Sequence, residues 1–138
     1  MPMRADIFLD TNILLYAASR DAAGLQKREK ARELLGRENV GLSVQVLAEF
    51  FVNATGKLKL PEDKVAAVLE SFESYPILPV TEAIFWAALV TRRRYQISYW
   101  DAAIIAAAAE LGCHTIFSED LNHGQIYDGV RVLNPFAD

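Results

Sequence analysis

The sequence has a single cysteine and no long hydrophobic run, and both absences exclude classes of protein. Because Cys113 stands alone, the chain has neither an internal disulfide nor a zinc site built from several thiolates, and we expect a buried, inert thiol. No apolar stretch approaches the roughly 20 residues that cross a bilayer. Residues 1–6 lead into a strand-like segment without the apolar region of a signal peptide, so we expect a cytoplasmic protein.

Positive charge is also scarce. The formal net charge is -4 at pH 7, which argues against a protein that holds nucleic acid mainly by electrostatic attraction to phosphate. Three local basic clusters remain, at Arg92–Arg94, in the segment Lys27–Arg32 and at Lys57 with Lys59. We interpret each first as a solvated helix face or terminus, although each could contact phosphate.

Short apolar segments alternate with longer helical patterns along the 138 residues, with no internal repeat, low-complexity tract or linker. The expected strands are 6–9, 40–43, 77–80, 115–118 and 130–133. The expected helices are 12–18, 25–36, 44–53, one that begins at Pro61, one from Thr81 to about Tyr95, and 99–111. This alternation predicts a single α/β domain over residues 1–138, a three-layer α/β/α sandwich around a mainly parallel sheet.

Two aspartates directly follow expected strands. Asp10 closes the run Ile7–Leu9, and Asp120 comes shortly after the strand 115–118. Ligand sites in parallel sheets lie outside the carboxyl ends of the strands, so we expect both carboxylates at the same edge of the sheet. Each has a plainer interpretation, since Asp10 could only cap the helix that follows and Asp120 could be a turn residue.

Two further acids lie within expected helices. Asp101 stands in a helix that is otherwise apolar all round until Glu110, although Ser98 and the helix dipole could satisfy it near the amino end. Glu49 belongs to a narrow polar stripe with Gln45 and Asn53, which is either a solvated face or the wall of a cleft.

A cation is needed if the four acids converge. Two ionised carboxylates about 4 Å apart repel by about 4 kcal/mol at an effective dielectric constant of about 20. With no lysine nearby in these motifs, Mg²⁺ or Mn²⁺ is the expected partner, and such an ion suits hydrolysis of a phosphodiester. Asn12 and Ser118 are then expected to orient water around the ion by hydrogen bonds.

Four sequence blocks together resemble the PIN-domain ribonucleases of the VapC toxin type, namely Phe8–Ala17, Leu47–Phe50, Tyr99–Ile104 and Phe117–Gly124. The resemblance spans nearly the whole chain and implies a metal-dependent endoribonuclease. It places the catalytic and metal-binding quartet on Asp10, Glu49, Asp101 and Asp120, with Mg²⁺ held chiefly by the first and third. It also implies a homodimer and inhibition by a small antitoxin protein.

Other interpretations of the same residues remain open. An aspartate after the first strand is also typical of haloacid-dehalogenase phosphatases, but these have a second aspartate where this chain has Asn12. A catalytically silent protein-binding module is the other alternative, and the four intact acids argue against it. His123 in the last block is interpreted as a structural or substrate-edge residue. Five large aromatic residues could contribute to a partner-binding surface, but we interpret them first as packing in the core, namely Phe50, Phe51, Phe72, Phe85 and Trp86.

Overall fold

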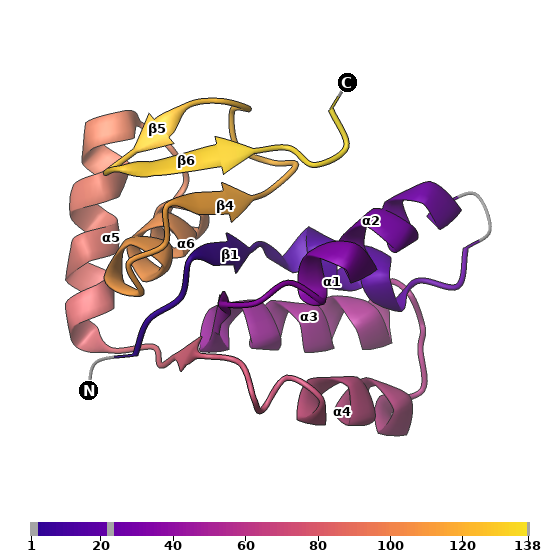
Figure 1. The fold of residues 1–138 in the computed structure, drawn as a ribbon. Helices are drawn as coiled ribbons and strands as arrows, with labels where there is room; N and C mark the ends of the chain where they lie inside the picture. The colour runs from indigo at the N-terminus through magenta and orange to yellow at the C-terminus, as the bar shows by residue number, and fades with distance from the viewer. Residues whose placement is uncertain (1–2, 22–23, 138) are drawn as a thin grey trace.

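The computed structural model describes residues 3–21 and 24–137, which form a sheet between two groups of helices (Figure 1). The strands are β1 (Ile7–Leu9), β2 (Val40–Ser43), β3 (Ile77–Leu78), β4 (Thr115–Phe117), β5 (Ile126–Tyr127) and β6 (Val130–Leu133). The helices are α1 (Thr11–Ala18), α2 (Leu25–Leu35), α3 (Val44–Gly56), α4 (Glu62–Glu70), α5 (Glu82–Tyr95) and α6 (Tyr99–Glu110).

The sheet has the order β3-β2-β1-β4-β6-β5, and every pair except β5 with β6 is parallel. The predicted mainly parallel sheet is therefore confirmed. The sequence analysis missed β5, which is only two residues long. Its signal was present, since Asp128 and Gly129 join β5 to β6 with φ angles of 50° and 82°, as a tight hairpin turn requires.

The helices cover the sheet in two groups, which gives the predicted three-layer α/β/α sandwich. In one group α1 packs on α2 and α3, and α3 packs on α4; in the other α5 packs on α6, which contacts β2, β4 and β6 (Figure 1). Helix α6 is buried from Ala102 to Ala108, as its apolar sequence predicts. This burial sets the first turn of α6, which carries Asp101, beside the sheet.

Most helix boundaries follow from capping residues. The side chains of Ser43, Thr81 and Ser98 accept backbone hydrogen bonds at the starts of α3, α5 and α6. Pro61 is the N-cap of α4 rather than its first helical residue. The strand expected over 77–80 ends at Leu78, because Pro79 has no backbone N–H to donate to a sheet.

Burial confirms one side-chain expectation and corrects another. Cys113 is buried, and desolvation together with the charge of Asp6 raises the pKa of its thiol to about 12. Phe85 and Trp86 are 40% and 56% exposed, so their assignment to the core is wrong. They lie on α5, where Val90 is exposed as well. No helix in the described part of the chain is long and apolar enough to cross a membrane.

Candidate functional site

A pocket of about 120 Å³ is lined by all four of the acids singled out in the sequence. Asp10 follows β1 and Asp120 follows β4, while Glu49 comes from α3 and Asp101 from α6. The parallel pairing of β1 with β4 brings the first two to one edge of the sheet. Among residues 3–21 and 24–137, no three Asp, Glu, His or Cys side chains are gathered tightly enough to form a metal site by themselves. The acids thus share a pocket without forming a close cluster.

Asp10 is the most buried of the four, with 6% of its surface exposed. One carboxylate oxygen accepts the N–H of Thr11 at 2.7 Å, and the other accepts the hydroxyl of Ser118 at 2.7 Å. Burial, helped by the negative charges of Asp120 and Glu49, nevertheless raises the pKa of Asp10 to about 6. Asp10 therefore caps α1 and also faces the pocket, so the two interpretations of its sequence position hold together.

Glu49 is held by two donors. Its Oε1 accepts from Nε2 of Gln45 at 2.7 Å, and its Oε2 accepts from the hydroxyl of Thr11 at 3.3 Å. Gln45 also donates to the backbone carbonyl of Trp100 at 3.3 Å, which links α3 to the start of α6. The sequence analysis did not identify Thr11 as a site residue. The polar stripe that contains Glu49 is thus a wall of the pocket.

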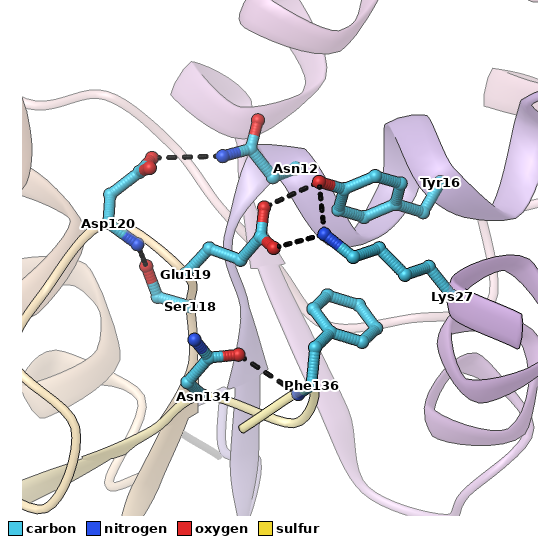
Figure 2. A network of polar contacts seen from close by, with 8 residues as sticks. All are labelled: Asn12, Tyr16, Lys27, Ser118, Glu119, Asp120, Asn134 and Phe136. Atoms are coloured by element: carbon cyan, nitrogen blue, oxygen red, sulfur yellow. Dashed lines mark hydrogen bonds and ion pairs between the residues drawn. The ribbon is translucent and has the colours of Figure 1, made fainter. Parts of the chain in front are cut away.

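Asn12 and Ser118 contact carboxylates. Asn12 donates its amide to Oδ2 of Asp120 at 3.0 Å, and the backbone N–H of Asp120 donates to the hydroxyl oxygen of Ser118 at 3.1 Å (Figure 2). Ser118 is fully buried and joins Asp120 to Asp10. Partial burial and the charges of Asp101 and Glu119 raise the pKa of Asp120. Both residues therefore hold the acids in place, and their role in orienting water around an ion stays a prediction.

Asp101 has the least constrained carboxylate of the four. Its backbone N–H donates to the hydroxyl oxygen of Ser98 at 3.1 Å, which is the expected cap of α6. Within the described part of the chain its carboxylate has no hydrogen bond and no ion pair, and the residue is half-buried in the pocket wall. The cap satisfies the helix and leaves the carboxylate available to a ligand.

Glu119 lies beside Asp120 but points into a separate network that the sequence analysis missed. Figure 2 shows Lys27 and Tyr16 meeting its carboxylate, at 2.8 Å from Nζ and 2.6 Å from the phenol oxygen. Nζ of Lys27 also lies 4.8 Å from the ring centre of Tyr16 and 5.2 Å from that of Phe136. Partial burial alone would raise the pKa of Glu119, but the hydrogen bonds and the charge of Lys27 lower it. This network holds Glu119, which stands between Ser118 and Asp120 in the sequence, in place.

One lysine from outside the four sequence blocks also lines the pocket. Lys57 follows the last turn of α3. Gln45, Glu49, Asn53 and Lys57 are spaced four residues apart, which puts them on one helix face, and all four line the pocket. Extending the polar stripe by one turn in the sequence would have identified this residue.

His123 lies outside the pocket and has a structural contact. Its Nδ1 accepts the backbone N–H of Asn134 at 2.8 Å, which ties the loop after β4 to the segment that follows β6.

Comparisons with known proteins agree with the family resemblance of the sequence. The family model of the PIN domain matches residues 7–129. No curated protein matches the chain. Among solved structures, the chain is similar to VapC20 of Mycobacterium tuberculosis, a toxin that cleaves the sarcin-ricin loop, with a TM-score of 0.67 and 21% identity over 83% of this chain and 92% of that chain.

Two other similar structures belong to toxin-antitoxin assemblies. The first is a toxin-antitoxin complex from Klebsiella pneumoniae, with a TM-score of 0.70 and 20% identity over 96% of this chain and 98% of that one. The second is DNA-bound VapBC from Salmonella typhimurium, with a TM-score of 0.67 and 20% identity over 93% and 96%. At such low identity these likenesses establish the fold alone.

Proposed function

The chain belongs to the PIN domain family, and on that basis we propose that it is a metal-dependent endoribonuclease that hydrolyses phosphodiester bonds, and the toxin of a toxin-antitoxin pair. The observation that carries the proposal is the shared pocket of Asp10, Glu49, Asp101 and Asp120. The toxin role is supported by the fold that the chain shares with a toxin that cleaves the sarcin-ricin loop and with toxin-antitoxin complexes.

The types of donor in the pocket, rather than their spacing in this structure, suit a hard divalent cation. Its acidic side chains offer only oxygen ligands, and neither histidine nor cysteine lines it. The raised pKa values of Asp10 and Asp120 reflect burial and mutual repulsion, which a bound cation would relieve. We assign Mg²⁺ or Mn²⁺ chiefly to Asp10 and Asp101, with Glu49 and Asp120 completing the site. When bound, such an ion lowers the pKa of water and stabilises charge on phosphoryl oxygens.

The chain's own residues hold this acidic site in place. Ser118 positions Asp10, Gln45 positions Glu49, and Asn12 positions Asp120, each through one of the hydrogen bonds described above. Fixing these ligands lowers the reorganisation needed when substrate arrives. The carboxylate of Asp101 has no such partner in the described residues and is free to turn toward a ligand.

The antitoxin partner has a candidate docking surface. A groove of about 420 Å³ between α1, α2, α3 and α4 has an apolar lining that includes the partly exposed Leu35, Leu60 and Val68. Its lining also includes four basic residues, namely Arg20, Arg28, Arg32 and Lys64. This combination fits an acidic amphipathic helix of an antitoxin, with its apolar face on the apolar lining and its carboxylates on the basic residues. The homodimer implied by the sequence resemblance stays a prediction.

The proposed activity is tested by incubating the purified protein with a mixed RNA pool, with Mg²⁺, with Mn²⁺ or with EDTA, and mapping the cut ends. We expect internal cuts with either ion and none in EDTA. Asp101→Asn should abolish cleavage, while Glu110→Gln, which removes an exposed acid from the other end of α6, should not. Equal cleavage in EDTA would refute the metal requirement. Loss of terminal phosphate without internal cuts would favour the phosphatase alternative.

A further inference from the structure

An RNA strand must approach a pocket that repels it. The chain has a net charge of -4 and four acids line the pocket, so phosphates need local cations to bind there. Several basic side chains are already engaged with acids in the described residues, namely Lys27 with Glu119, Lys30 and Arg37 with Glu33, and Arg94 with Asp128.

Lys57 differs from these residues in both position and pairing. It is the one basic residue among those that line the acidic pocket, it is exposed, and within the described residues it forms no ion pair. Its backbone N–H donates to the carbonyl of Asn53 at 2.9 Å, so its main chain is fixed to the end of α3 while its side chain stays free. A side chain whose backbone is fixed and whose ammonium group has no ion-pair partner is suited to bind a phosphate.

The spacing along α3 separates Lys57 from the acids. Lys57 stands two helical turns beyond Glu49, about 12 Å along the helix axis at 1.5 Å per residue. Asn53 lies between them and donates its amide to the backbone carbonyl of Glu49 at 2.8 Å, which leaves its side-chain oxygen available to accept a hydrogen bond. The face therefore runs from acidic through neutral to basic.

We propose that Lys57 binds a phosphate of the RNA strand that flanks the phosphate to be cut, and that the strand follows the face of α3 formed by Gln45, Glu49, Asn53 and Lys57. This inference rests on the proposed ribonuclease function. The cation holds the strand at the basic end of the face, while the carboxylates receive the scissile phosphate with their metal ion. The attraction between Lys57 and this flanking phosphate thus offsets the repulsion between the pocket acids and the RNA strand.

Lys59 provides a matched control. It is an exposed lysine two residues further along the chain, with the same charge, and it does not line the pocket. Replacing either lysine with glutamine changes the net charge equally. Only a specific phosphate contact distinguishes the two variants.

The test measures binding of a labelled single-stranded RNA in Mg²⁺ to protein that carries Asp101→Asn, so that cleavage does not interfere. We expect Lys57→Gln to weaken binding roughly 3- to 10-fold and to reduce the slope of log K against log salt by about 0.7, the value for one phosphate contact on a single strand. Lys57→Arg should retain most of the affinity, and Lys59→Gln should change little. In the active protein, Lys57→Gln should raise KM more than it lowers kcat.

Equal effects of Lys57→Gln and Lys59→Gln, or an unchanged salt slope, would overturn the proposal. Thermal unfolding of both variants checks that the fold is intact. RNA binding that depends on Lys57 without any cleavage by the unmodified protein would refute the nuclease and leave the phosphate contact standing. Cleavage that is indifferent to Lys57 would refute the contact alone.

Discussion

Glu119 and Asp120 are neighbours in the chain, yet their carboxylates have opposite surroundings. Glu119 meets Lys27 and Tyr16, and these contacts lower its pKa against the effect of burial. Asp120 meets a neutral amide from Asn12, and burial and nearby negative charge raise its pKa. Two adjacent residues therefore differ in role: Glu119 forms an ion pair, while Asp120 lines the pocket (Figure 2).

Asp128 repeats the paired arrangement far from the pocket. It lies in the turn between β5 and β6, where it accepts the hydroxyl of Thr91 at 2.6 Å and forms an ion pair with Arg94. Tyr95 adds a third donor at 3.2 Å. Burial would raise the pKa of Asp128, but these contacts lower it. The paired acid attaches the hairpin to α5.

Acids that form ion pairs, such as Glu119 and Asp128, differ from the pocket acids in what balances their charge. Paired acids connect elements and stabilise the fold, since their charge is balanced by groups of the chain itself. Among the pocket acids, Asp10, Glu49 and Asp120 accept only from neutral donors, and in the described residues the carboxylate of Asp101 has no donor. The charge of the pocket acids is therefore not balanced by an ion pair within the described residues. A metal-binding nuclease needs this arrangement, although it lowers the stability of the metal-free protein.

The largest expected difference between the two kinds of acid is in toxicity. Expression of the unmodified protein in a bacterium should arrest growth, and Asp10→Asn should abolish the arrest because it removes a proposed metal ligand. Asp128→Asn should still arrest growth, because it removes a paired acid outside the pocket. Colony counts after induction measure the effect. Equal arrest by all three proteins would argue against catalysis in this pocket.

A second difference should appear in stability. The pKa of Asp10 is raised from 3.8 to about 6 in the folded protein, so the folded state binds more protons between these values. The free energy of unfolding of the metal-free protein should therefore fall as pH rises through this range, by up to about 3 kcal/mol at 1.36 kcal/mol per pKa unit. Asp10→Asn should be more stable than the unmodified protein at pH 8, by about 2 kcal/mol.

Urea unfolding in EDTA at pH 5 and pH 8 measures the upper part of this effect, about 1.4 kcal/mol, because Asp10 is already mostly protonated at pH 5 in the folded protein. Added Mg²⁺ should restore the stability of the unmodified protein at pH 8 and leave Asp10→Asn nearly unchanged. An Asp10→Asn variant that loses stability at pH 8 would show that the ionised carboxylate is satisfied by the protein alone.

The smallest difference concerns Glu119. Its pKa is lowered, so its ion pair with Lys27 stabilises the protein above the ordinary pKa of 4.5, and this contribution is lost as pH falls through the folded-state value. Because the side chain of Lys27 is 41% exposed, Glu119→Gln should lower the free energy of unfolding at pH 7 by only about 0.5 to 1 kcal/mol. Unfolding curves of the two proteins should converge once the pH falls below the folded-state pKa of Glu119; a difference that persists there would point to lost packing instead.

Much of the fold could be predicted because its elements are locally specified. Apolar strands followed by longer helical patterns predict a parallel sheet, and Ser43, Thr81 and Ser98 mark helix starts. Prediction failed where the signal was two residues long, as in β5, or where exposure depended on tertiary packing, as at Trp86.

For the candidate site, Asp10, Asp101 and Asp120 stood out by their positions in sequence, while Glu49 depended more on the family resemblance, and the structure places all four around one pocket. Their hydrogen-bond partners could not be identified in this way. Asn12 meets Asp120 across 108 positions of the chain, and Lys27 meets Glu119 across 92. No local pattern encodes such pairs.

The sequence alone thus determined the α/β architecture and which acids could act together, because both depend on residue types within or beside single elements. The tertiary structure decided which acids form ion pairs with basic groups of the chain and which line the pocket without one. It also brought Lys57 into the acidic pocket. Pairing depends on the distance between side chains from different elements, and packing of the helices on the sheet sets that distance.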